Sequence, residues 1–490
     1  METTQPRSAP AFADTRVRPN ITAILRSDGA AIAGLFLAAG VFYLGPGLTF
    51  AVLGGALYLA LALWKPYLTP VPIIAAASLF YRPRPISNYV FPLAEVLIVL
   101  SIAAWGLRDS FDILRRPGGL AVPDLVRDLM RDAIRRPFVW AAAGFLAVGV
   151  LALFLPHPTH RAEALREFRW TIVEPILFFG LIARYIRTER DILRVLTAFL
   201  VPCALNAQVG VDQYLFGDTW SMEGVGRAIG LYTGATGFGI FVGRGLAIAA
   251  TLALFLPWAD VKLRRWRWAF ALLCVPLGLG MIFSFTRGAW VGVAVALVAV
   301  MLLGRSWRIL AGFIGIAAAG TAAILIRYGD LERFSTSGSS LLSRTDIWAA
   351  ALRVIRDHPW AGIGQDQFLY QDAKYGIPNT RFQTVSHPHD WVLDTWLRLG
   401  IWGLALMVAT FAAFYWYGIR AFRGRSGTLL GALILALIAG MTDHIVHGFF
   451  DMAYFTQDLA LAFWMLVGLM GAVVLMGRQE VKSEIIPETI

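Results

Sequence analysis

The sequence has few charged residues for its length. Only 15% of its 490 residues are Asp, Glu, Lys or Arg, and 58% are hydrophobic, whereas a typical soluble domain is about 25% charged. A soluble chain of this length would form several domains with hydrated surfaces, and this one has too few charges to cover them. The composition therefore argues against an ordinary soluble enzyme and against a disordered tail protein.

Cysteine is also scarce, and no cleavable signal peptide is evident. Cys203 and Cys274 both lie in apolar runs, so no disulfide framework is expected. The first 25 residues are polar, and the apolar run that follows continues directly into a second one. The formal net charge of +11 comes from Lys and Arg dispersed among loops. This dispersion predicts a membrane protein with basic cytoplasmic loops and argues against a nucleic-acid partner.

Long apolar runs dominate the chain. A membrane span needs about 20 mostly apolar residues. Fourteen candidate spans are 29–45, 47–64, 69–81, 87–105, 138–155, 170–187, 192–215, 236–258, 266–285, 288–304, 308–326, 390–416, 427–447 and 456–476. The third is short, with Pro70 and Pro72 near its start, so we expect twelve to fourteen helices. The predicted fold is an all-α polytopic membrane protein.

The distribution of Lys and Arg predicts the orientation of the spans. Basic residues fill the loops 106–137 and 259–267 and the turns 305–308 and 420–425, all on one side if the spans alternate. We assign that side to the cytoplasm. The predicted parts are a cytoplasmic tail 1–28, a bundle 29–326, an external loop 327–389, membrane helices 390–476 and a cytoplasmic tail 477–490. Within the bundle, segment 106–137 has the helical spacing of a basic amphipathic helix on the inner membrane surface.

The long external loop is predicted to contain its own amphipathic helix. The segment Ser343–Asp346 resembles a capping box and would start this helix. Apolar residues then recur at helical spacing up to Ile355, and Pro359 and Gly364 follow the helix end. We expect the helix to lie over the mouth of the bundle.

Four arginines are candidates for holding an anionic ligand. Arg227 lies in a short external segment that also contains Tyr232, a candidate substrate-binding residue. Arg287 lies in a tight turn between two spans. Arg344 opens the loop helix, and Arg244 lies inside a span, about 12 Å deep for roughly eight residues at 1.5 Å each. A guanidinium offers a planar fork that matches phosphate. The alternatives are contact with lipid headgroups for the first three and a structural ion pair for Arg244, with Glu95 as its candidate partner.

Two histidines stand just before a predicted span, in the segment Ser386–Trp391. His389 keeps helical spacing to Leu393 and Gly400, so it is predicted to begin the span and point to the mouth of the bundle. Its imidazole could accept a proton from a sugar hydroxyl. A metal site made of His387, His389 and Asp390 is a weaker interpretation, because the spacing is not a standard zinc pattern and no convincing further ligand set is evident. No metal and no cofactor are therefore expected.

Several motifs together resemble the O-antigen ligase and polymerase superfamily. They are Ser343–Trp348, His358–Gly364, His389–Asp390 with Leu393, Gly400 and Gly403, the turn Thr286–Gly288, the segment Gly226–Gly230, and His447–Asp451 with Tyr454 and Phe463–Trp464. Each motif alone is weak, but their order, spacing and shared side of the membrane make the combination fairly specific. The resemblance covers about residues 170–487.

The resemblance implies transfer of a preassembled glycan from undecaprenyl pyrophosphate to a sugar of a glycolipid acceptor such as the lipid A core. It places the chain in a bacterial inner membrane with its site facing the periplasm. By the same resemblance, Arg227 and Arg287, and also Arg344, would bind pyrophosphate, and His389 would serve the acceptor hydroxyl. The family usually has Asn where this chain has Asp390. Either the Asp390 carboxylate orients the imidazole of His389, or its presence indicates that His387 serves the acceptor hydroxyl instead.

Two other functions remain open at this point. A polymerase of lipid-linked repeat units would share the fold and differ in its acceptor, although the single long external loop favours a ligase. A transporter would have charges along a membrane pathway and an internal repeat, whereas charges here gather on the predicted outer side. Many glycosyltransferases that use lipid-phosphate sugars place an acidic pair in the first external loop. The segment Leu44–Gly47 has no carboxylate, which argues against that type. The sequence does not indicate an oligomeric state.

Overall fold

The computed structural model describes residues 27–485, apart from 87, 116–133, 155–157, 218, 223–224, 309, 313, 315–337 and 377–384. Its helices are α2 (Asp28–Leu44), α3 (Gly47–Trp64), α4 (Pro70–Ala76), α5 (Leu93–Leu114), α7 (Val139–Phe154), α8 (Arg161–Phe168), α9 (Glu174–Tyr185), α10 (Glu189–Phe216), α11 (Ala235–Phe255), α12 (Val261–Phe283), α13 (Arg287–Leu303), α16 (Gly338–Asp357), α17 (Asp372–Tyr375), α18 (Trp391–Phe422), α19 (Leu429–Gly448) and α20 (Gln457–Ile485). Two small hairpins, β1 (Arg84–Ile86) with β2 (Tyr89–Phe91) and β3 (Trp220–Met222) with β4 (Val225–Arg227), are the described strands.

The predicted all-α polytopic membrane fold is confirmed. Within the described residues, seven helices are long and apolar enough to cross a membrane: α3, α10, α11, α12, α18, α19 and α20. Shorter apolar helices lie at four other predicted spans. Most of the predicted span 308–326 and most of the predicted amphipathic segment 106–137 lie outside the described residues, although α5 continues to Leu114.

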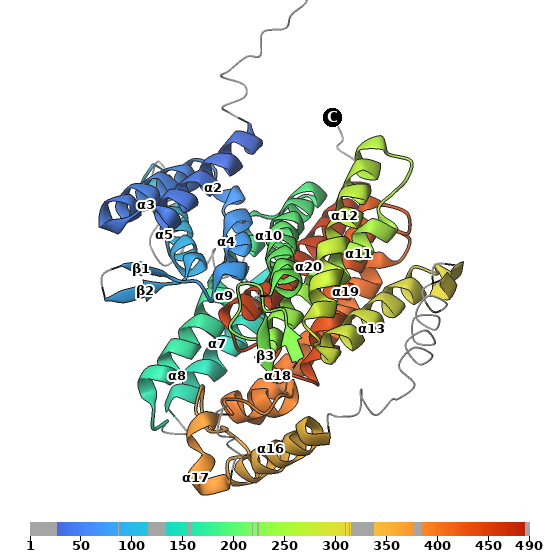
Figure 1. The fold of residues 1–490 in the computed structure, drawn as a ribbon. Helices are drawn as coiled ribbons and strands as arrows, with labels where there is room; N and C mark the ends of the chain where they lie inside the picture. Colours follow the sequence, from blue (N-terminus) through green and yellow to red (C-terminus); the bar gives the residue numbers. More distant parts are fainter. Residues whose placement is uncertain are drawn as a thin grey trace, which may run out of the picture.

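The helices α11, α13 and α19 pack against one another, and α20 packs against α19 (Figure 1). Small residues let these helices approach closely. A Cβ added at Gly243 in α11 would lie 3.3 Å from the Cβ of Ala289 in α13, and one at Gly440 in α19 would lie 2.9 Å from Ile248 in α11. α19 is buried along almost its whole length. The segment that leads into α20 begins just beyond the last turn of this buried helix.

α18 is interrupted near its start. Gly400 has φ 68° and ψ −175°, a conformation open mainly to glycine, and a Cβ there would lie 2.1 Å from the carbonyl oxygen of Trp360. The backbone N–H of Ile363 donates to the carbonyl of Leu397 at 2.7 Å. The predicted single span 390–416 is therefore two helical segments, and the outer loop packs into the break.

The predicted loop helix is present as α16, but it begins at Gly338 rather than at the proposed capping box. Ile347, Ala351 and Val354 are buried against the first segment of α18, in a cluster that also contains Leu397. Figure 1 shows α16 and α17 below the end of the bundle where α18 begins. The indole N–H of Trp348 donates to the carbonyl of Pro388 at 2.9 Å. This contact joins the loop helix to the chain segment that carries the two histidines.

Candidate active site

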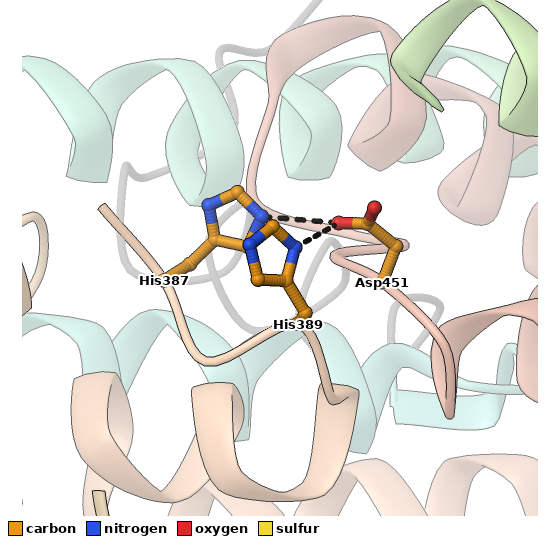
Figure 2. Close-up of side chains that lie close together, drawn as sticks. All are labelled: His387, His389 and Asp451. Atoms are coloured by element: carbon orange, nitrogen blue, oxygen red, sulfur yellow. Dashed lines mark hydrogen bonds and ion pairs between the residues drawn. The ribbon is translucent and has the colours of Figure 1, made fainter. Parts of the chain in front are cut away.

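Two histidines and one aspartate meet at the end of the bundle. His387 and His389 come from the segment before α18, and Asp451 comes from the segment between α19 and α20. Nε2 of His387 and Nδ1 of His389 each lie 3.0 Å from the same oxygen, Oδ1 of Asp451. The backbone N–H of Met452 donates to that oxygen at 2.7 Å. Figure 2 shows the two imidazoles side by side, both directed at the carboxylate.

The helix-register argument for His389 is wrong. α18 begins at Trp391, so His389 lies two residues before the helix, with a left-handed φ of 55°. Its direction is set by this turn and by Asp451, and not by spacing along the helix. Of the two alternatives for Asp390, orientation of the imidazole does not fit the hydrogen bonds that its carboxylate makes. Asp390 is the N-cap of α18, and its carboxylate accepts the N–H groups of Val392 and Leu393 at 2.9 and 3.0 Å.

The electrostatics separate the two imidazoles. Burial lowers the pKa of His389, but the charge of Asp451 and its hydrogen bond outweigh burial, so this pKa is raised. Burial and the neighbouring imidazole of His389 lower the pKa of His387. Burial raises the pKa of Asp451, but the two histidines outweigh it and hold this pKa well below its usual value. Asp451 is therefore ionised at neutral pH, and His389 is the histidine that takes a proton more readily.

The hydrogen bonds also indicate which ring nitrogens carry protons in the neutral state. An ionised carboxylate only accepts hydrogen bonds, so Nε2 of His387 and Nδ1 of His389 must be the donors. Nδ1 of His387 is then an acceptor, and the hydroxyl of Ser386 lies 2.9 Å from it. In His389 the nitrogen left to accept a proton is Nε2. This is the arrangement of a general base oriented by a carboxylate.

The histidines and Asp451 line a cavity of about 170 Å³. The other lining residues come from just before the first small hairpin, from the segment between the second hairpin and α11, from the start of α11, and from the segment that leads into α20 and its first turn. They are Tyr81, Tyr232, Thr233, Gly234, Thr236, Gly237, Ile240, Met452, Thr456, Asp458 and Leu459. Tyr232, predicted to bind substrate, is one of them. Its hydroxyl donates to Oδ2 of the buried Asp458 at 2.6 Å. The cavity thus combines titratable groups with hydroxyls and two aromatic rings.

Arg227 and Arg287 meet at one turn beside this cavity. Nε of Arg227 donates to the carbonyl of Ser284 at 2.7 Å, and its guanidinium lies 3.2 Å from the hydroxyl of Thr286. Arg287 follows as the exposed first residue of α13. A Cβ added at Gly288 would lie 2.8 Å from Phe450. The turn that carries Arg287 therefore packs against the chain directly before Asp451. Neither arginine lines the cavity itself.

Arg344 and Arg244 have different surroundings. Arg344 is near enough to His389 for its charge to lower the pKa of that histidine. Arg244 is completely buried and donates to Nδ1 of His444 at 2.8 Å. The alternative of an ion pair between Arg244 and Glu95 is wrong, because Glu95 pairs with Arg169 at 3.3 Å. Arg244 does not line the cavity, and its hydrogen bond joins α11 to the end of α19.

Sequence reasoning missed Asp451 and Asp458 as site residues. In the sequence, Asp451 is only part of the motif His447–Asp451. It is more than 60 residues from both histidines, so no local pattern indicates the contact. The expectation that His387 and His389 have no further ligand set is also wrong. His387, His389 and Asp451 each offer one ligand atom, these atoms lie within 4.8 Å of one another, and together they could hold a metal ion.

Comparisons with known proteins find similarity to O-antigen ligases. A family model described as O-antigen ligase matches residues 272–408, which include the turn of Arg287, α16 and the histidine segment. An O-antigen ligase of Pseudomonas aeruginosa is 31% identical over 169 residues, covering 34% of this chain and 39% of that protein. An O-antigen ligase of Salmonella typhimurium is 26% identical over 194 residues, covering 36% of this chain and 46% of that protein. The matches span less than half the length of these relatives. The apolar helices make the chain a multi-pass membrane protein, and over part of its length it is similar to O-antigen ligases.

Proposed function

We propose that this protein is a membrane glycosyltransferase of the O-antigen ligase type. It would move a preassembled glycan from undecaprenyl pyrophosphate to a hydroxyl of an acceptor sugar, in a glycolipid such as the lipid A core. The site would face the periplasm of a bacterial inner membrane. The observation that carries the proposal is the pair of histidines on Asp451, lining a cavity beside the turn that holds Arg287.

In the proposed reaction, Nε2 of His389 accepts the proton of the acceptor hydroxyl. The hydroxyl oxygen attacks the anomeric carbon of the donor glycan, and the bond from that carbon to the pyrophosphate oxygen breaks. Asp451 stabilises the imidazolium that forms, because it is ionised and hydrogen-bonded to Nδ1. A single displacement of this kind inverts the anomeric configuration.

The arginines would stabilise the leaving pyrophosphate. Charge develops on its oxygen as the bond breaks, and donors fixed in advance at that position lower the barrier. Arg227 is fixed by the backbone of Ser284, and Arg287 is placed by the same turn and by the start of α13. Arg344 adds a positive charge on the side of His389. Because pyrophosphate is a good leaving group and the arginines supply the charge, the proposed reaction needs no metal.

Reconstitution with defined substrates tests this function. Purified protein would be given an undecaprenyl pyrophosphate-linked oligosaccharide with either lipid A-core or a second lipid-linked repeat unit as acceptor. We expect product with lipid A-core and chelator present. Product only with the second lipid-linked unit would favour a polymerase, and no product with either acceptor would contradict glycan transfer.

A further inference from the structure

We propose that His387, His389 and Asp451 form a binding site for a zinc-type transition-metal ion, and that a bound ion blocks the base atom of His389. The first half concerns metal binding alone. The second half rests on the proposed function, because it predicts that the ion inhibits transfer. The site would be regulatory, because the protein could not carry out transfer while the ion is bound.

The donor set and its spacing fit such an ion. Two imidazole nitrogens and a carboxylate oxygen are ligands that zinc accepts, with bonds of about 2.0–2.2 Å. Ligand atoms around one tetrahedral ion then lie about 3.3 Å from one another. Nε2 of His387 and Nδ1 of His389 are each 3.0 Å from Oδ1 of Asp451. A small outward movement of the rings would make room for the ion.

The surroundings resemble those of a site with an open position. A metal-bound histidine usually has a partner on its other ring nitrogen, which fixes the ring. The Ser386 hydroxyl is such a partner for Nδ1 of His387, at 2.9 Å. The Met452 N–H holds the Asp451 carboxylate in place. The cavity of about 170 Å³ adjoins all three ligands and leaves space for a water molecule as the fourth ligand.

Proton positions explain why the ion would inhibit. Without metal, the ring protons lie on Nε2 of His387 and Nδ1 of His389, both directed at Asp451. An ion bound to these two nitrogens needs their lone pairs, so each ring proton moves to the opposite nitrogen of the same ring. No proton is gained or lost. Nδ1 of His387 then donates to Ser386, and Nε2 of His389 becomes an N–H group. It can no longer accept a proton from the acceptor hydroxyl.

Metal binding is measured first, without reference to activity. Full-length protein is purified without a polyhistidine tag, stripped with chelator, and titrated with Zn²⁺ against a zinc indicator, and with Co²⁺ to follow its visible absorption. We expect about one ion per chain. His387→Ala and Asp451→Ala should each abolish this binding. Ser386→Ala should weaken it by about 10–100-fold, as for other outer partners of metal ligands. His358→Ala, an exposed histidine of the same loop, is the matched control and should bind normally.

Inhibition is measured second, in the transfer assay. Zn²⁺ at saturating concentration should stop transfer, and chelator should restore it. No stoichiometric binding, or equal binding by His387→Ala, would overturn the metal site and leave the proposed function standing. Binding without any transfer activity in metal-free protein would support the site and contradict the proposed function. Binding with unchanged or increased transfer would overturn the inhibitory role.

Discussion

Replacement of Asp451 tests how the carboxylate serves His389. Asp451→Asn keeps an oxygen that can accept from both histidines but removes the charge. A hydrogen bond to a charged group contributes about 1.5–3 kcal/mol, against about 0.5–1.5 kcal/mol for a neutral one. Loss of the difference at the bond to His389 should slow transfer on the order of tenfold, at 1.36 kcal/mol per factor of ten. Asp451→Ala removes the acceptor altogether, and its loss should approach the ~10²–10⁴-fold expected when a general base is removed.

The pH dependence of the transfer rate also tests the role of the Asp451 charge, because it shows in which direction the pKa of His389 is shifted. The reaction needs unprotonated His389, and the charge of Asp451 raises the pKa of that histidine. The wild-type rate should therefore fall as pH falls through this raised pKa. In Asp451→Asn the pKa is lower, so the acidic limb should move to lower pH. Initial transfer rates at matched protein levels, with chelator present, provide the profile. An unmoved acidic limb, or Asp451→Asn as inactive as Asp451→Ala, would refute the role of the charge.

Four further outcomes are expected. Arg287→Ala and Arg227→Ala should abolish transfer in folded, membrane-inserted protein. Arg287→Lys should also have low activity, because a point charge does not reproduce the guanidinium fork. Full activity of Arg287→Lys would contradict bidentate binding of pyrophosphate by Arg287. In a cysteine-free background, an impermeant thiol reagent should label Arg356→Cys from the periplasm and Lys262→Cys only after the inner membrane is opened, and the reverse pattern would reverse the topology. Chelator should leave transfer intact, whereas loss of transfer restored by a divalent ion would revive a metal-dependent mechanism. Arg398→Met should lower the free energy of unfolding by about 3–5 kcal/mol, because the buried carboxylates of Glu167 and Asp394 lose their partner. Thermal unfolding measures this change, with the exposed Arg356→Met as the control. Equal melting temperatures of the two variants would contradict the prediction.

The helices could be predicted from the sequence because a membrane span is a local property. Apolar runs of sufficient length identify α10, α11, α19 and α20 without knowledge of their neighbours. The break in α18 could not be predicted in the same way. Gly400 is equally compatible with a close helix contact, and its left-handed conformation follows from the packing of Trp360 in a distant loop.

Only part of the candidate site could be predicted, because sequence patterns again identify local features and not contacts between distant segments. His387 and His389 stand out because they are adjacent, in a polar segment before an apolar run. Their partner Asp451 lies 64 and 62 residues further along the chain, so no local spacing reveals the contact. In the sequence, Glu95 is a candidate partner of Arg244 only because both residues lie at similar depths in their predicted spans. Depth in the membrane does not indicate which helices are neighbours. α11 packs against α19, which supplies His444 instead of Glu95.

The central claim is that His389, held by Asp451, takes the proton of the acceptor hydroxyl. The most direct measurement is the rate of the transfer step in a single turnover, with donor glycan bound and chelator present, for wild type, His389→Ala and His387→Ala. The account predicts a loss of about 10²–10⁴-fold in His389→Ala and a much smaller loss in His387→Ala, which leaves the base atom in place. An inactive His387→Ala beside an active His389→Ala would contradict it.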